Sequence, residues 1–209
     1  MTDKKYQILS RETLFQGYFR MDRLKLRHEK FAGGWSNTFT REIFDRSGKI
    51  AAVLPFDPKS DKVVMIEQFR SGVLAAGEHP WITEVVAGVI DGGETPEDSV
   101  RREAFEEAGC TITDLHKIAD YYTTPGCSSE HLTLFVGRTH APPSGTIFGV
   151  DHEDEDIRVV VLDAAQAISL LFSNKIRDAL SLIALQWFAM HHTELRSRWL
   201  VSDVGTPII

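Results

Sequence analysis

The sequence predicts an α+β fold, in which strands, one helix, more strands and two closing helices follow one another along the chain. Three observations lead to this prediction. Apolar residues alternate or run together over strand-length segments on both sides of residue 95. A helix-start signal opens at Thr95, and two segments with helical periodicity end the chain. This order is typical of a mixed α and β protein in which much of the strand pairing is not parallel.

The first 46 residues are rich in charge and predict exposed strands. Between Tyr18 and Leu26, apolar and charged side chains alternate, as they do in a strand with one solvated face. The pair Gly33-Gly34 marks a turn between two strands. We therefore assign residues 1–46 to a small N-terminal antiparallel sheet and residues 47–209 to the main domain.

The main domain opens with apolar runs that indicate buried strands. Ile50–Phe56 and Val63–Phe69 are separated by the turn-forming run Asp57–Asp61, and Trp81–Val86 follows as a third strand. Further along, we expect strands over 115–123, 131–138 and 156–162, and helices over 163–172 and 177–195.

The helix that follows Thr95 has clear start and stop signals. Thr95 suits the N-cap, Pro96 suits the first helical position, and Glu97 and Asp98 suit the positive end of the helix dipole. Gly109 is a favoured residue just past a helix end. A helix from Pro96 to about Ala108 is therefore expected.

Composition excludes several classes of protein. The 209 residues are 43% hydrophobic and 25% charged, which is ordinary for a globular protein and unlike a disordered one. A net charge of −7 argues against binding to long DNA or RNA. Two cysteines do not form a disulfide framework. The chain has neither a secretion signal nor an apolar run long enough for a membrane span, so we expect a cytoplasmic protein.

Three carboxylates share one edge of the expected helix. Glu103, Glu106 and Glu107 cover about a third of its circumference, beside an apolar face. Like charges at this spacing repel, and a divalent cation such as Mg²⁺ or Mn²⁺ would turn that cost into a gain. The alternative is an ordinary solvated acidic face.

The stretch from Gly88 to Cys110 resembles the Nudix box, in which fixed glycine, glutamate and arginine positions surround such an acidic helix. Two apolar positions of the box hold the small residues Ala104 and Cys110. The fixed positions of the box are matched by Gly88, Glu94, Arg102, Glu103, Glu106, Glu107 and Gly109. The resemblance implies the Nudix fold, a mixed-sheet α/β/α sandwich, here with the small N-terminal sheet added.

The resemblance extends over most of the chain to the bacterial ADP-ribose pyrophosphatases of that family. In that subfamily a proline follows the box at a set distance, and Pro125 lies sixteen residues after Gly109. Cys127 replaces the usual second glycine of the same loop. The resemblance implies Mg²⁺-dependent hydrolysis of ADP-ribose to AMP and ribose 5-phosphate. Two alternatives stay open, namely hydrolysis of another nucleotide sugar such as GDP-mannose and a non-catalytic module that senses a nucleotide.

The resemblance also implies roles for individual residues. The carbonyl of Ala87 and the carboxylates of Glu103 and Glu107 would hold the metal, with Glu106 joining directly or through water. The general base would lie on the acidic loop of residues 152–156. Glu153 is the first candidate and Glu155 the second; the alternative is a solvated acidic loop.

Substrate contacts and assembly are expected from the same resemblance. The homodimer it implies would share each substrate site between two subunits, with Tyr18 and Arg41 supplied across the interface. The candidate substrate-binding residues, for the phosphates, the ribose hydroxyls and the adenine, are Tyr18, Arg41, Arg70, Glu84, Thr124 and Glu130.

Overall fold

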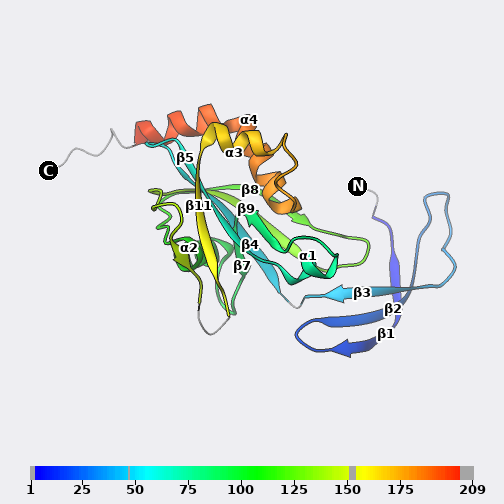
Figure 1. The fold of residues 1–209 in the computed structure, drawn as a ribbon. Helices are drawn as coiled ribbons and strands as arrows, with labels where there is room; N and C mark the ends of the chain where they lie inside the picture. Colours follow the sequence, from blue (N-terminus) through cyan, green and yellow to red (C-terminus); the bar gives the residue numbers. More distant parts are fainter. Residues whose placement is uncertain (1–2, 47, 151–153, 203–209) are drawn as a thin grey trace. The chain divides into compact units, whose positions relative to one another are not determined.

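The computed structural model describes residues 3–46, 48–150 and 154–202 and divides the chain into two compact units. Both units are drawn in Figure 1. The first unit consists of Met1–Lys49 together with Tyr121–Leu132. The second consists of Ile50–Asp120 and Thr133–Ile209. The first unit therefore includes a segment that the sequence had placed in the main domain.

The first unit is built on an antiparallel three-stranded sheet in the order β1 (Tyr6–Gln16), β2 (Arg20–His28) and β3 (Phe39–Asp45). All eleven residues of β1 are exposed. On β2, the buried carboxylate of Asp22 accepts a hydrogen bond from the Thr13 hydroxyl at 2.9 Å, and others from arginine side chains. A buried charge needs such partners, and this one ties β1 to β2.

The second unit contains an eight-stranded sheet, except for the strand ends that fall within Met1–Lys49 and Tyr121–Leu132. Its main order is β10-β11-β5-β4-β9-β8, with β6 added on β5 and β7 on β4. The pairs β11–β5, β5–β4, β5–β6 and β4–β7 are antiparallel. The strands are β4 (Lys49–Asp57), β5 (Lys62–Phe69), β6 (Trp81–Glu84), β7 (Val86–Val89), β8 (Leu115–Tyr122), β9 (His131–Arg138), β10 (Ile147–Phe148) and β11 (Ile157–Asp163).

The prediction of one continuous strand over Trp81–Val86 is wrong. The chain forms two strands here, because it changes partner at Val85. Before this residue Glu84 pairs with Ile66 of β5, and after it Val86 pairs with Val53 of β4. An apolar run does not reveal such a switch, because it does not specify which neighbouring strand each residue pairs with.

Helices cover both faces of this sheet (Figure 1). On one face α2 (Pro96–Ala108) packs its apolar side against alternate residues of β4 and β5, including Val53 and Ile66. On the other face Phe56 of β4 contacts Phe188 of α4 (Ala179–Ser202), with ring centroids 4.9 Å apart. Alternation along β4 therefore supplies both cores.

The remaining helices depart modestly from the predicted ranges. Helix α3 (Ala164–Leu170) is shorter than expected, α4 extends to Ser202, and the short α1 (Ser71–Ala75) was not predicted. Within the described residues, none of these helices combines the length and apolar character that crossing a membrane requires.

Candidate active site

Helix α2 has the ends that its sequence predicts. The Thr95 hydroxyl accepts a hydrogen bond from the Asp98 amide at 3.1 Å, and the Asp98 carboxylate accepts one from the Thr95 amide at 3.3 Å. Gly109 ends the helix in the left-handed conformation, with φ 62°. A side chain at Gly109 would also overlap the ring of Phe148. These contacts fix where the acidic edge of the helix begins and ends.

The acidic edge of α2 lies directly beside the core. Val100, Ala104 and Ala108 are fully buried, as their spacing predicts. Glu107 is buried together with these residues and is only 3% exposed. An ordinary solvated acidic face would leave its carboxylates in water, and Glu107 does not fit that alternative.

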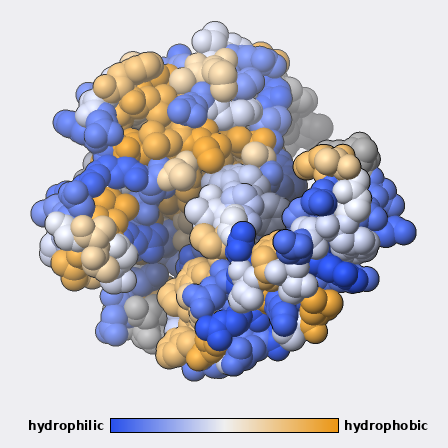
Figure 2. Space-filling view, turned by 90° about the vertical axis from the view of Figure 1, so that its right-hand side faces the viewer, coloured by the Kyte–Doolittle hydropathy of each residue, from blue (hydrophilic) through white to orange (hydrophobic). Residues whose placement is uncertain are grey.

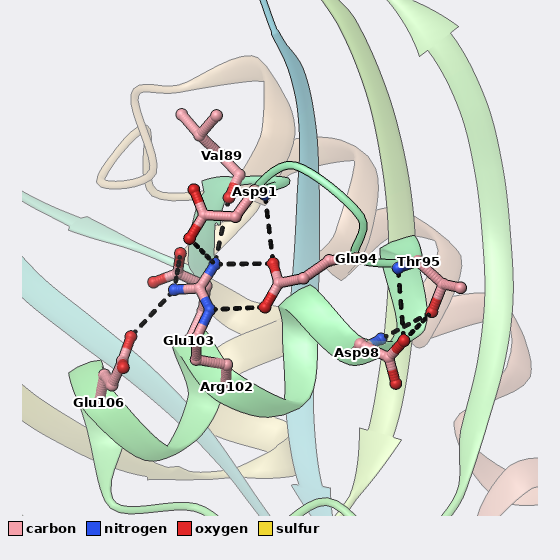
Figure 3. A network of polar contacts seen from close by, with 8 residues as sticks. All are labelled: Val89, Asp91, Glu94, Thr95, Asp98, Arg102, Glu103 and Glu106. Carbon is pink, nitrogen blue, oxygen red and sulfur yellow. Dashed lines mark hydrogen bonds and ion pairs between the residues drawn. The ribbon is translucent and has the colours of Figure 1, made fainter.

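Arg102 holds the neighbouring carboxylates together, as Figure 3 shows. Its guanidinium donates two hydrogen bonds to Glu94, at 2.9 and 3.1 Å. It also donates to Glu103 at 2.8 Å, to Glu106 at 3.0 Å and to the carbonyl of Val89 at 3.2 Å. The bonds from Arg102 lower the pKa of Glu94, and the bonds to Glu94 raise the pKa of Arg102. Arg102 therefore stays charged and orients this cluster.

Gly88 makes room for one of these carboxylates. It lies on β7, opposite α2, and a Cβ built at this position would overlap the side chain of Glu103. Its φ is not positive, so the requirement for glycine here comes from close approach and not from backbone conformation. The sequence motif does not reveal this reason.

We expect Gly88→Ala to displace the Glu103 carboxylate and lower turnover by about 10²-fold, because a misplacement of about 1 Å can cost that much. Gly92→Ala is the matched control, since a Cβ at Gly92 has no atom within 4 Å. Steady-state kinetics of both variants checks this expectation. Equal activity of the two variants would contradict the positional role of Gly88.

Glu107 is a buried carboxylate with a perturbed pKa. One of its oxygens accepts a hydrogen bond from the Ala87 amide at 3.2 Å. Burial raises its pKa well above the ordinary value, and the charges of Glu103 and Glu155 raise it further. Burial also raises the pKa of Glu103, although Arg102 opposes this. Without a cation, burial and the neighbouring carboxylates therefore favour the protonated form of Glu107.

These residues suit a hard divalent cation. The donors available are carboxylate oxygens and the backbone of β7, which are the ligands that Mg²⁺ and Mn²⁺ prefer. Within residues 3–46, 48–150 and 154–202, no three acidic, histidine or cysteine side chains already converge on a single point. Each carboxylate has two oxygens, so a bond to Arg102 or Ala87 leaves acceptor capacity for a cation.

Two predicted substrate residues pair with each other in the second unit. Arg70 follows β5 and donates a hydrogen bond to Glu84, the last residue of β6, at 2.6 Å. Burial raises the pKa of Glu84, and the charge of Arg70 opposes that rise. In the β5–β6 register Glu84 lies opposite Ile66, so the Arg70 side chain reaches it from four residues further along the chain. The sequence did not predict the pair.

Two further predicted substrate residues, Tyr18 and Arg41, present aromatic and cationic groups on the first unit. Tyr18 is 81% exposed, and its ring lies edge-on to Phe19 at 4.8 Å between centroids. Arg41 lies on β3 with its guanidinium over the ring of Phe39 at 4.8 Å. Both side chains are accessible from solvent.

The loop around Pro125 belongs to the same unit. Thr124 is exposed, and its carbonyl accepts a hydrogen bond from the amide of Cys127 at 3.1 Å, which closes a turn. Glu130 is paired with Arg46, whose guanidinium donates to it at 2.8 Å. Sequence reasoning missed Arg46, since 84 residues separate the two partners.

The predicted base Glu153 lies outside the described residues. Glu155, the second candidate, is described, and one of its oxygens accepts a hydrogen bond from the Val150 amide at 3.3 Å. Its charge raises the pKa of both Glu103 and Glu107. The electrostatic environment thus groups Glu155 with the acidic edge of α2, an association that the sequence did not indicate.

Comparison with known proteins agrees with this geometry. Residues 46–181 match the NUDIX domain family. The ADP-ribose pyrophosphatase of Escherichia coli (strain K12) is 43% identical over 193 residues, which is 92% of each chain. The GDP-mannose pyrophosphatase of Escherichia coli O1:K1 / APEC is 33% identical over 153 residues, covering 73% of this chain and 78% of its own.

A solved structure supports the fold. The crystal structure of an ADP compounds hydrolase aligns with 96% of both chains at a TM-score of 0.67 and 20% identity. Together with the family match, this likeness confirms the predicted Nudix fold with its small N-terminal antiparallel sheet. Nudix hydrolases generally use divalent metal ions, and the oxygen donors along α2 suit such ions. Because the family match covers more than half of the chain and includes the acidic helix, this chain belongs to the Nudix family.

Proposed function

We propose that this protein hydrolyses the pyrophosphate bond of ADP-ribose to AMP and ribose 5-phosphate, with Mg²⁺ as its cofactor. The observation that carries the proposal is the 43% identity, over 92% of both chains, to an enzyme named for this activity. The intact carboxylate cluster of α2 supports catalysis rather than nucleotide sensing alone. Water attacks one phosphorus, the P–O bond of the pyrophosphate bridge breaks, and a base accepts the proton of the water.

The metal ligands in this proposal are the carbonyl of Ala87 and the carboxylates of Glu103 and Glu107, with Glu106 beside them. A divalent cation bound there supplies charge neutralisation on the diphosphate and lowers the pKa of a bound water. Mn²⁺ is expected to replace Mg²⁺, because both prefer oxygen ligands. Arg102 holds Glu103 and Glu106 in place throughout.

The predicted substrate-binding residues offer charged, polar and aromatic groups to the substrate. Arg70 offers a cation to a phosphate oxygen, and Glu84 offers an acceptor to a ribose hydroxyl. Tyr18 offers a ring face to adenine. Arg41, Thr124 and Glu130 complete the proposed set with further charged or polar groups.

We assign the base role to Glu153 and a different role to Glu155. Glu153 is the base by resemblance to the family. The charge of Glu155 reaches Glu103 and Glu107, which supports a contribution to holding the cation rather than to accepting the proton. The two roles predict different kinetic effects.

A homodimer is the proposed assembly. Strand β1 is an edge strand whose residues are all exposed, and it carries large apolar side chains such as Ile8 and Phe15. On the face drawn in Figure 2, hydrophobic residues are exposed in patches among hydrophilic ones. An exposed apolar edge favours covering by another chain, and a second copy of this chain is the occupant proposed here.

Sedimentation equilibrium should give twice the 23.5 kDa chain mass, and a 23.5 kDa species at micromolar concentration would contradict the dimer. The cytoplasmic location stays a prediction.

The substrate is tested with a panel of nucleotide sugars at equal concentration, by measuring phosphatase-coupled phosphate release with Mg²⁺ and with EDTA. We expect ADP-ribose to be the best substrate, with kcat/KM at least about 10-fold above GDP-mannose, because a matched set of polar contacts discriminates strongly. EDTA should abolish the release. GDP-mannose outrunning ADP-ribose would favour the alternative hydrolase. Binding of ADP-ribose without Mg²⁺-dependent turnover would favour the sensing module.

A further inference from the structure

At Val85 the chain stops pairing with β5 and begins pairing with β4. The backbone amide of this residue is buried, and no strand of the sheet accepts a hydrogen bond from it. The residue belongs to neither β6 nor β7 and is 1% exposed. Buried amides need a hydrogen-bond partner. The partner is the hydroxyl of Ser181 in α4, which accepts from the Val85 amide at 2.9 Å.

Ser181 is itself held rigidly. It is fully buried in the first turn of α4. Its own amide donates to the carboxylate of Asp178 at 2.7 Å, in the manner of a helix cap. The start of α4 is thus fixed to the point where the chain crosses from one strand to the other.

The residues on either side of this point belong to the proposed site. Glu84, directly before Val85, accepts the hydrogen bond from Arg70. Ala87, two residues after it, donates its amide to Glu107 and is the proposed carbonyl ligand. A shift of the backbone at Val85 would therefore move β7 relative to the acidic edge of α2.

We infer that Ser181 is a positioning residue for the divalent cation: its hydroxyl fixes the β6–β7 switch and thereby the backbone of Ala87 against Glu107. The inference rests on the proposed function in so far as it concerns the same metal ligands. Partners that orient metal ligands typically affect metal affinity by 10–100-fold.

The test is calorimetric titration of Mn²⁺ into the full chain without substrate. Ser181→Ala should weaken Mn²⁺ binding about 10-fold. The matched control is Ser99→Ala, because the hydroxyl of Ser99 is also fully buried but has no hydrogen-bond partner among the described residues. Ser181→Cys provides a second variant of similar volume with a weak acceptor, in case the alanine variant does not fold. Faster hydrogen exchange of the Val85 amide in the Ser181 variants should accompany the weaker binding.

Two outcomes would overturn the inference. One is Mn²⁺ affinity in the Ser181 variants equal to that of the wild type. The other is an equal loss in Ser99→Ala, which would show a general effect of removing a buried hydroxyl. Because no substrate is present, these outcomes are distinct from a failure of the proposed activity. Wild-type protein that binds Mn²⁺ but leaves ADP-ribose intact would refute that activity alone.

Discussion

Glu107→Gln should lower kcat for ADP-ribose by about 10³-fold, equivalent to about 4 kcal/mol of transition-state stabilisation. Glutamine keeps the size of the side chain and an oxygen that can accept the Ala87 amide. It removes the negative charge that the proposed cation requires at a position that is almost fully buried. The loss should therefore be in catalysis and metal affinity rather than in folding.

The stability of the metal-free Glu107→Gln protein should change in the opposite direction. Burial raises the pKa of Glu107 in the folded state above its unfolded value. Between those two pKa values the folded protein binds the proton more tightly, so the free energy of unfolding falls as pH rises through that window. Above the window the ionised, buried carboxylate remains destabilising. Glutamine removes this penalty, so its advantage over wild type should appear as the pH rises above the unfolded pKa.

Denaturant unfolding at several pH values, together with steady-state kinetics, checks both expectations. Glu97→Gln is the matched control, since Glu97 is exposed in the first turn of the same helix. It should retain activity and show no comparable pH-dependent gain in stability. Activity of Glu107→Gln within threefold of wild type would remove Glu107 from the proposed metal site.

Glu153→Gln should lower kcat by about 10²-fold or more, because general base catalysis contributes about that amount. Its apparent affinity for Mg²⁺ should stay near the wild-type value. Glu155→Gln should instead raise the Mg²⁺ concentration needed for half-maximal activity, since its charge acts on Glu103 and Glu107. At saturating Mg²⁺ it should recover more of its turnover than Glu153→Gln does.

Kinetics of both variants over a range of Mg²⁺ concentrations separates the two roles. Near-normal turnover of Glu153→Gln would refute its assignment as the base. A loss of kcat in Glu155→Gln that saturating Mg²⁺ does not restore, with Glu153→Gln unaffected, would transfer the base role to Glu155.

Local sequence signals were sufficient for the helix that carries the site. Thr95, Asp98 and Gly109 set the ends of α2 through contacts within a few residues, so their effect is readable from spacing. The position of Glu107 beside Val100 and Ala104 follows from helical periodicity in the same way.

Other features depend on contacts between distant parts of the chain. The change of strand partner at Val85 can be predicted only when the neighbouring strands are known. The hydrogen bond from the Val85 amide to the Ser181 hydroxyl joins residues 96 positions apart. The Arg70–Glu84 pair joins two strands of the sheet, and Glu84 lies opposite Ile66 rather than Arg70 in their register. Neither apolar periodicity nor turn chemistry specifies strand order or register over such distances.

In the proposed function, the acidic edge of α2 binds a divalent cation for pyrophosphate hydrolysis. The most direct test is a crystal structure with Mg²⁺ and a non-hydrolysable ADP-ribose analogue. We expect Mg²⁺ bound by the Ala87 carbonyl and by the carboxylates of Glu103 and Glu107, next to the diphosphate. A diphosphate bound elsewhere, or Mg²⁺ with no contact to Glu103 or Glu107, would contradict the account.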